Sequence, residues 1–275
     1  MPTKKRPAAG TPARTTWPAA LTVLEEVRAD LGEASALVAL PSGRFLVADD
    51  EGGIRLVDIG GTRPKVTLLH DADDDDRVAG LEGMTRVGDV IIAVREQDGA
   101  LVSFPVPSSS TSPSTTGTDL EVLGLLPRPA TTNGKKNKAN KGWEGLAHLP
   151  AAVAFDGRDH LVAVHEDKPR AVGVFAWPSL TLEHTVLIDD LDGEFDDLLP
   201  DLSDVAVHPA TGELWIMSDE GECIVRVTLG ASGLTLVASH SLPVDDGEKP
   251  EGLAFDDDGA LWLVTDDSGR LLRLG

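Results

Sequence analysis

One short sequence pattern recurs five times along this chain. An apolar segment follows a small residue or an acid–glycine pair, and a glycine-containing turn, a second apolar segment and an acidic turn come after it. The copies begin near Ser35, Glu82, Glu144, Ser203 and Glu251, so successive starts are 47, 62, 59 and 48 residues apart. A repeat of this length built from short strands is typical of a β-propeller, in which each repeat folds as one four-stranded blade.

The alternation of apolar and polar residues predicts four strands in each of the first four copies and three in the last. The predicted strands are 35–40, 44–48, 54–58 and 66–70; 83–87, 90–95, 100–105 and 119–126; 145–155 with an interruption, 160–165, 171–176 and 181–188; 203–208, 213–218, 222–228 and 233–240; and 252–256, 260–265 and 270–274. The last copy therefore lacks an outer strand.

The missing strand can come from the other end of the sequence. Residues 20–28 (LTVLEEVRA) form a strand-like run ahead of the first copy, although a short helix also fits their spacing. Pairing this run with the last copy would close the ring and remove an exposed sheet edge. The fold prediction is an all-β, five-bladed β-propeller closed by its N-terminal strand, with a six-bladed ring as the alternative.

The domain prediction is a single propeller over residues 18–275, preceded by a basic, disordered tail at 1–17. Two segments interrupt the regular spacing of the predicted strands: a Ser/Thr/Pro-rich stretch near 105–118 and a basic, polar stretch near 128–141. We expect both to be flexible insertions. The tail has no apolar signal segment. The sequence contains no run of about 18 apolar residues, so we expect no membrane-spanning helix. With a single cysteine, Cys223, the chain fits a reducing compartment, and we expect a cytoplasmic monomer.

The formal net charge of −22 limits the partners of the protein. Nucleic acids and anionic membrane surfaces would repel such a chain, so neither is expected to bind it. A divalent cation, or an unknown small ligand or protein that docks on an acidic face, fits the charge better. An acidic run at 71–76 (DADDDD) approximates the spacing of an EF-hand, but the central glycine and the helical flanks are missing, so we expect a solvated loop.

The acidic residues gather at one end of the predicted blades. Adjacent strands are antiparallel, so the start of each first strand and the end of each second strand meet at the same end. Carboxylates that converge there around the axis would repel one another unless a hard cation, calcium above all, lies among them. The alternative is that they are solvated surface charges. The candidate metal-binding residues are Glu82, Glu144, Glu251, Asp204, Glu166 and Asp219.

The repeated phrases also resemble a known family. The matching segments are LEGM at 81–84, NKGWEGLAH at 140–148 with LVAVHEDKPR at 161–170, DLSDVAVHPATGELWIMSDE at 201–220 and KPEGLAFDDDGALWLV at 249–264. In order and spacing they resemble the SdiA-regulated (YjiK-type) family of bacterial β-propellers, which are distantly related to NHL-repeat propellers. The resemblance implies five blades and a calcium site, with Glu82, Glu144 and Glu251 at the family's Glu-Gly positions. It implies no established reaction, and Asp204 stands where the family usually has glycine.

Two functions fit these observations. The first is a calcium-binding propeller that acts as a ligand- or partner-binding module. The second is a metal-dependent hydrolase of the lactonase, esterase or phytase type, in which calcium polarises a substrate oxygen and a neighbouring group acts as base. His165, beside Glu166, is the best candidate base, but strand alternation points neighbours to opposite faces, so no catalytic residue is assigned.

Overall fold

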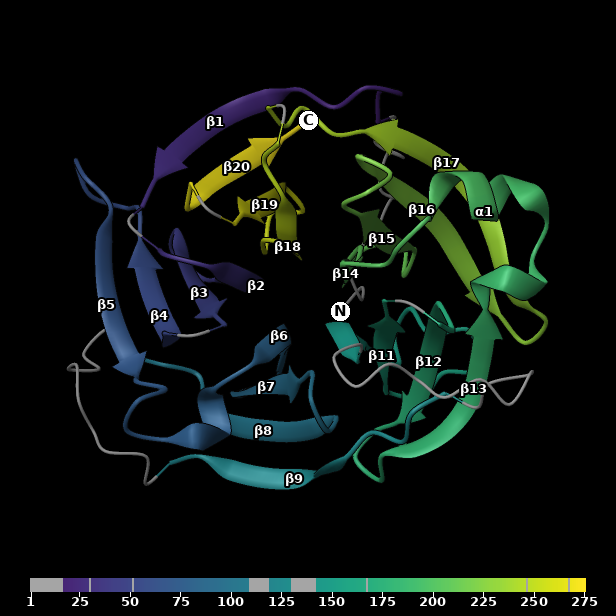
Figure 1. Ribbon diagram of the computed structural model, residues 1–275, viewed down its shortest axis with the longest axis horizontal. Coiled ribbons are helices and arrows are strands. Elements are labelled where there is room, and N and C mark those ends of the chain that lie inside the picture. The colour runs from purple at the N-terminus through teal and green to yellow at the C-terminus, as the bar shows by residue number, and fades with distance from the viewer. Residues whose placement is uncertain are drawn as a thin grey trace, which may run out of the picture.

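Five antiparallel sheets of four strands form a closed ring around a central axis in a computed structural model of the protein (Figure 1). The structure describes residues 17–29, 31–50, 52–108, 119–129, 142–166, 168–245, 247–266 and 268–275. The expected tail up to residue 16 and the centres of both expected insertions, 109–118 and 130–141, lie outside the described residues. The fold is the predicted five-bladed β-propeller, and the six-bladed alternative is wrong.

Each of blades 1 to 4 is a meander in which neighbouring strands follow one another along the chain, the first strand being innermost. Blade 5 has the same form, except that its outermost strand comes from the N-terminal part of the chain. The strands of blades 1 to 3 are β2 (Ala34–Leu40), β3 (Arg44–Asp49), β4 (Gly53–Asp58) and β5 (Lys65–His70); β6 (Leu81–Val87), β7 (Val90–Arg95), β8 (Ala100–Pro105) and β9 (Glu121–Leu125); and β10 (Trp143–Leu149), β11 (His160–His165), β12 (Ala171–Ala176) and β13 (Thr181–Leu187). Blade 4 contains β14 (Asp204–Val207), β15 (Leu214–Ser218), β16 (Cys223–Gly230) and β17 (Gly233–Ser241), and blade 5 contains β18 (Pro250–Phe255), β19 (Leu261–Thr265), β20 (Arg270–Leu274) and β1 (Val23–Arg28).

The N-terminal strand closes the ring, as the sequence predicted. Strand β1 pairs antiparallel with β20, and the backbone groups of Thr22 and Gly275 exchange hydrogen bonds at 2.9 and 3.1 Å just before that pairing. A parallel bridge from Ala20 to Ser241 continues the contact onto β17, so the segment ties blade 5 to blade 4. The helical alternative for residues 20–28 is therefore wrong.

Five hydrophobic clusters hold the ring together, one between each pair of adjacent blades. Strand alternation produces this arrangement, because successive side chains point to opposite faces of a sheet. In β7, for example, Ile91 and Ala93 face blade 1, whereas Ile92 and Val94 face blade 3. The second strand of each blade is thus buried on both faces.

One predicted strand is too long. The sequence predicted an interrupted strand over 145–155, but β10 ends at Leu149. The carbonyl of Pro150 accepts hydrogen bonds from the backbone nitrogens of Val153 and Ala154 at 3.0 Å, and this turn replaces the ladder. The described helices are short: η1 (Asp76–Val78), η2 (Ile188–Asp190) and α1 (Gly193–Leu198). None of these could cross a membrane.

Candidate functional site

A β-bulge lies at the start of the innermost strand in four of the five blades and changes the direction of one side chain in each. The pairing register shifts between Ala34 and Ala36 in β2, and equivalent shifts occur in β6, β10 and β18. A bulge of this kind re-aims the extra side chain and disrupts the ladder locally. The residues at this position, including the one that precedes Asp204 in β14, are called the inner ring: Ser35, Glu82, Glu144, Ser203 and Glu251.

The glycine after each ring glutamate allows the inner strands to approach closely. A Cβ atom on Gly83 would lie 2.6 Å from the carbonyl oxygen of Glu144, and one on Gly252 would lie 2.8 Å from the backbone nitrogen of Leu37. On Gly145 it would lie 2.6 Å from a carboxylate oxygen of Asp204. No side chain fits in these spaces, so the Glu-Gly pair combines an inward-facing acid with a close contact between blades.

A second set of carboxylates surrounds the first. In every blade, the residue directly after the second strand is acidic, and these five residues are called the outer ring: Asp50, Glu96, Glu166, Asp219 and Asp266. Their backbone nitrogens are fixed by the segment that leads into the inner strand, as when the nitrogen of Asp50 donates to the carbonyl of Glu33 at 3.0 Å and that of Asp266 to Lys249 at 2.9 Å. The sequence repeat therefore places one acid per blade at the same level.

The two rings line a single cavity of about 300 Å³ at one end of the central axis, which is called the acidic mouth. Its lining residues are Glu33, Ala34, Ser35, Asp50, Glu82, Glu96, Glu144, Glu166, Asp201, Ser203, Asp219, Lys249, Glu251 and Asp266. Ten of these fourteen residues carry a carboxylate, and Lys249 is the sole Lys or Arg among them. This excess of negative charge in one confined space makes a cation the natural occupant.

Five of the six residues predicted from sequence line the acidic mouth: Glu82, Glu144, Glu166, Asp219 and Glu251. Asp204 does not line it, and is fully enclosed between inner strands. Its Oδ1 accepts from the backbone nitrogen of Val205 at 2.7 Å and its Oδ2 from that of Leu253 at 2.6 Å, while the backbone of Leu146 makes a further hydrogen bond. Asp204 thus satisfies backbone donors next to the cavity.

Burial and mutual repulsion oppose ionisation of the inner-ring glutamates. Desolvation, followed by the charges of Glu144 and Asp50, raises the pKa of Glu82 to about 10. Desolvation and the charges of Glu96 and Glu166 raise the pKa of Glu144 to about 9, and desolvation raises the pKa of Glu251 to about 8. Either these groups carry protons at neutral pH, or a cation replaces the protons.

Three carboxylates of the mouth lie close enough together to share one ion. One oxygen each from Glu96, Glu144 and Glu166 can be chosen so that all three lie within 4.8 Å of one another. Glu144 Oε1 is buried and has no hydrogen-bond partner within the described structure. Glu96 was not among the predicted ligands. It follows a second strand, as Glu166 does in the next blade, and this equivalence could have identified it.

The histidines lie elsewhere. His165, the candidate base, is buried; its Nδ1 lies 2.9 Å from the carbonyl oxygen of Pro169, and its ring packs edge-on against Trp143. His148 lines a different cavity, also of about 300 Å³, at the opposite end of the axis, with Arg86 and Asp257. Within the described residues, no histidine or cysteine lines the acidic mouth.

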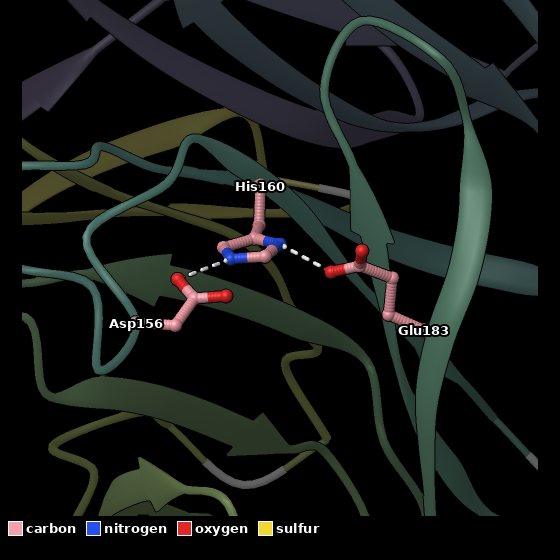
Figure 2. A group of neighbouring side chains, drawn as sticks. All are labelled: Asp156, His160 and Glu183. Atoms are coloured by element: carbon pink, nitrogen blue, oxygen red, sulfur yellow. Dashed lines mark hydrogen bonds and ion pairs between the residues drawn. The ribbon is translucent and has the colours of Figure 1, made fainter.

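A second group of possible metal ligands, formed by Asp156, His160 and Glu183, lies in blade 3 (Figure 2). These residues lie in the loop between β10 and β11 and in strands β11 and β13, away from the acidic mouth. The fully buried ring of His160 lies between Asp156, whose Oδ1 is 2.8 Å from Nε2, and Glu183, whose Oε2 is 3.5 Å from Nδ1. Arg158 bridges the same two carboxylates, with contacts of 2.7 Å to each. Because Arg158 already offsets their charge, this group forms an ion network that fastens the β10–β11 turn to β13.

Comparisons with known proteins agree with the fold. The family model described as SdiA-regulated matches residues 72–268. Among solved structures, glutaminyl cyclase from Myxococcus xanthus is similar at 13% identity, with 93% of this chain and 96% of that chain covered and a TM-score of 0.61. The PQQ-bound aldose sugar dehydrogenase from Streptomyces coelicolor is similar at 17% identity, with coverages of 94% and 98% and a TM-score of 0.54.

A calcium structure of a family AA12 protein from Trichoderma reesei is similar at 14% identity, with coverages of 94% and 97% and a TM-score of 0.53. At these identities the likenesses concern the fold alone. The search of curated proteins returned no match. The family model spans well over half of the sequence and includes four of the five copies of the repeat, so the chain belongs to the SdiA-regulated family.

Proposed function

We propose that this protein binds calcium in the acidic mouth and uses the loaded site to hold a small ligand or a protein partner. The observation that carries the proposal is the cluster of Glu96, Glu144 and Glu166, whose ligand oxygens lie within 4.8 Å of one another in a cavity with ten carboxylates and one lysine. Glu144 Oε1, buried and without a hydrogen bond, is the kind of atom that a bound ion would satisfy.

The chemistry of the donors favours calcium over other common ions. Calcium takes six to eight oxygen ligands in flexible geometry, and carboxylates, hydroxyls and waters would supply them here. Zinc and copper prefer nitrogen and sulfur donors, which the described lining of the mouth does not offer. Magnesium requires a tighter octahedral shell than a cavity of about 300 Å³ imposes.

The mouth suits ligands that bring neutral oxygen atoms or positive charge. Three glutamates cannot complete a shell of six to eight ligands, so the remaining positions would go to water or to a bound molecule. The surrounding carboxylates, among them Asp50, Asp219 and Asp266, would repel a polyanion. A ligand with hydroxyl or carbonyl oxygens, or a basic segment of a partner, therefore fits better than a polyphosphate or a nucleic acid.

Calorimetric titration with calcium, together with melting curves in calcium and in chelator, tests the proposal. We expect saturable binding and a higher melting temperature in calcium, because an ion that binds the folded state stabilises it by mass action. Glu144→Gln should weaken binding at least about tenfold, since a charged ligand is lost. The same variant should melt in chelator at or above the wild-type temperature, because it removes a buried carboxylate that resists ionisation.

Asp257→Asn is the matched control, since it makes the same change of charge at the opposite end of the axis. It should leave calcium binding unchanged. Absence of calcium binding at millimolar concentration in the wild-type protein would overturn the proposal. Equal losses of affinity in both variants would show a diffuse charge effect and would contradict a localised site.

A hydrolytic reaction is the second candidate, supported by Glu82. In the metal-free protein, desolvation and the charges of neighbouring carboxylates raise the pKa of Glu82 to about 10, and a carboxyl group that retains its proton beside the proposed ligands could donate it to a leaving group. Calcium would supply Lewis-acid polarisation of a substrate oxygen. Esterase, lactonase and phosphatase assays with and without chelator test this candidate, and turnover that disappears in both chelator and Glu82→Gln would support it.

A further inference from the structure

The cavity at the other end of the axis, called the apolar cavity, differs from the acidic mouth in its chemistry. It also has a volume of about 300 Å³, and it is lined by the later residues of all five innermost strands, such as Met84 in β6 and Phe255 in β18. Fourteen of its nineteen lining residues are apolar, whereas ten of the fourteen in the acidic mouth carry a carboxylate. Water finds few hydrogen-bond partners against such walls, so an apolar molecule would displace it readily.

Most polar side chains of the apolar cavity are already engaged by the protein. Thr85 Oγ1 accepts a hydrogen bond from the backbone nitrogen of His148 at 2.9 Å, and Nε2 of His148 lies 3.3 Å from Oδ1 of Asp159. The carboxylate of Asp256 accepts three hydrogen bonds of 2.8 to 3.0 Å, two from backbone nitrogens of the turn that follows and one from the indole of Trp262. These groups have little capacity left for a ligand.

Arg86, the sole Lys or Arg in the described lining of the apolar cavity, is the exception. It is half-buried, and its Nε donates to the carbonyl of Gly88 at 2.9 Å. No carboxylate of the described residues pairs with its guanidinium, whereas Arg226, for example, pairs with Glu213 at 2.6 Å. The remaining charged residue of the lining, Asp257, is exposed, so water offsets its charge. An unpaired guanidinium in a partly dehydrated place binds a carboxylate well, through two parallel hydrogen bonds.

We infer that the apolar cavity binds a small amphipathic carboxylate, with its hydrocarbon chain against the apolar walls and its carboxylate group on Arg86. An apolar body combined with one well-placed polar contact is the usual composition of small-molecule sites. None of the lining residues is shared with the acidic mouth, so the inference does not depend on the proposed function. The net charge of −22 permits such a monoanion, because the ten carboxylates of the mouth lie at the other end of the axis and salt screens exposed charges beyond about 10 Å at 0.1 M.

Calorimetric titration of the full chain with four probes tests the inference. Octanoate, octanol and octylamine share one hydrocarbon chain and differ in the head group, whereas acetate has the carboxylate with hardly any chain. Octanoate should bind saturably, octanol and octylamine at least about tenfold more weakly, and acetate not measurably, because both the chain and the charged contact are needed. The titrations are run in chelator at physiological ionic strength, since calcium in the acidic mouth could otherwise hold a carboxylate.

Variants of Arg86 locate the bound carboxylate. Arg86→Gln should weaken octanoate binding at least about tenfold, and Arg86→Lys, which keeps the charge and loses the paired hydrogen bonds, should weaken it less. Asp257→Asn should tighten binding, by up to about threefold, because it removes a like charge from the rim. Arg63→Gln is the matched control, since Arg63 is exposed between β4 and β5 and lines neither cavity. It should leave octanoate binding unchanged.

Several results would overturn the inference. They are the absence of octanoate binding at millimolar concentration, octylamine or octanol binding as tightly as octanoate, and equal losses of affinity in Arg86→Gln and Arg63→Gln. Octanoate binding that appears only when calcium is added would place the carboxylate in the acidic mouth and would overturn it as well. Melting curves show whether each variant is folded, and if Arg86→Gln is not, the comparison of probes on the wild type and the partial loss in Arg86→Lys decide.

Discussion

Asp204 in β14 accepts a hydrogen bond from the backbone nitrogen of Leu253 in β18, with 2.6 Å between that nitrogen and Oδ2. The backbone of Leu146 in β10 also hydrogen-bonds this carboxyl group, so one side chain connects three neighbouring inner strands. Burial raises the pKa of Asp204 well above its ordinary value, while the hydrogen bonds from the backbone of Leu253 and Val205 oppose the increase. The ring is thus held by a polar contact at its narrowest part as well as by the clusters between blades.

Removing this carboxyl group should destabilise the protein without removing its metal site. Asp204→Ala leaves two or three buried backbone donors without an acceptor, and we expect a loss of about 2–4 kcal/mol in the free energy of unfolding. Asp204→Asn keeps one acceptor oxygen and should lose less. Chemical denaturation measures both. A large loss of calcium affinity with unchanged stability would instead make Asp204 a ligand.

Stability in the absence of metal should fall as the pH rises. The pKa values of Glu82, Glu144 and Glu251 lie at about 10, 9 and 8 in the folded protein, against an ordinary value of 4.5. Between these limits the folded state binds more protons than the unfolded state, so each group lowers the free energy of unfolding by up to about 1.4 kcal/mol per pH unit. Urea denaturation in chelator from pH 5 to pH 9 measures the slope.

Saturating calcium should flatten that slope, because the ion stabilises the ionised carboxylates. Glu82→Gln should reduce the slope measured in chelator, since one titrating group is removed. A metal-free protein whose stability is constant or increases across this pH range would show that the ring glutamates ionise freely.

Lys249 should weaken calcium binding. It is the sole Lys or Arg among the described lining residues. Desolvation raises the pKa of Asp219 and of Glu251, and the positive charge of Lys249 opposes part of that increase. Lys249→Gln removes a like charge from the surroundings of the ion and should tighten binding by about threefold to tenfold at low salt. Arg86→Gln, at the opposite end of the axis, is the control and should have no effect. Weaker binding in Lys249→Gln would mean that the lysine positions a calcium ligand.

The glycine of the Glu-Gly pair should be irreplaceable in blade 3. A Cβ atom on Gly145 would lie 2.7 Å from the backbone nitrogen of Val205, and a strand backbone cannot move aside cheaply. Gly145→Ala should therefore cost about 2 kcal/mol or more. At Gly193 in α1, nothing lies within 4 Å of the added atom, so Gly193→Ala should be neutral or stabilising. Thermal melting of the two variants makes the comparison, and equal melting temperatures would contradict the close contact between blades.

The repeat made most of the fold predictable, because each copy carries its own strand alternation and turn residues. The N-terminal strand followed from the missing strand of the last blade, and β1 pairs with β20 as expected. The end of β10 could not be predicted, since the turn after Pro150 depends on backbone hydrogen bonds that apolar residues such as Val153 and Ala154 do not signal.

The mouth was predictable from the antiparallel order of strands, whereas the individual partners of each carboxylate were not. Asp204 illustrates the limit. It follows Ser203 at the position where three other copies of the repeat read Glu-Gly, so sequence alone suggests another acid of the ring. Ser203 directly precedes β14 and lines the mouth, whereas Asp204 is the first residue of the strand and accepts hydrogen bonds from the backbone of adjacent strands. One residue of register separates a possible metal ligand from a structural acceptor.

The most direct test of the calcium site is anomalous X-ray diffraction at long wavelength from crystals grown with calcium. The predicted result is a strong anomalous peak in the acidic mouth, bounded by Glu96, Glu144 and Glu166, that is absent from Glu144→Gln crystals prepared in the same way. A mouth without any peak, or calcium bound only to surface acids such as those of residues 71–76, would contradict the proposal.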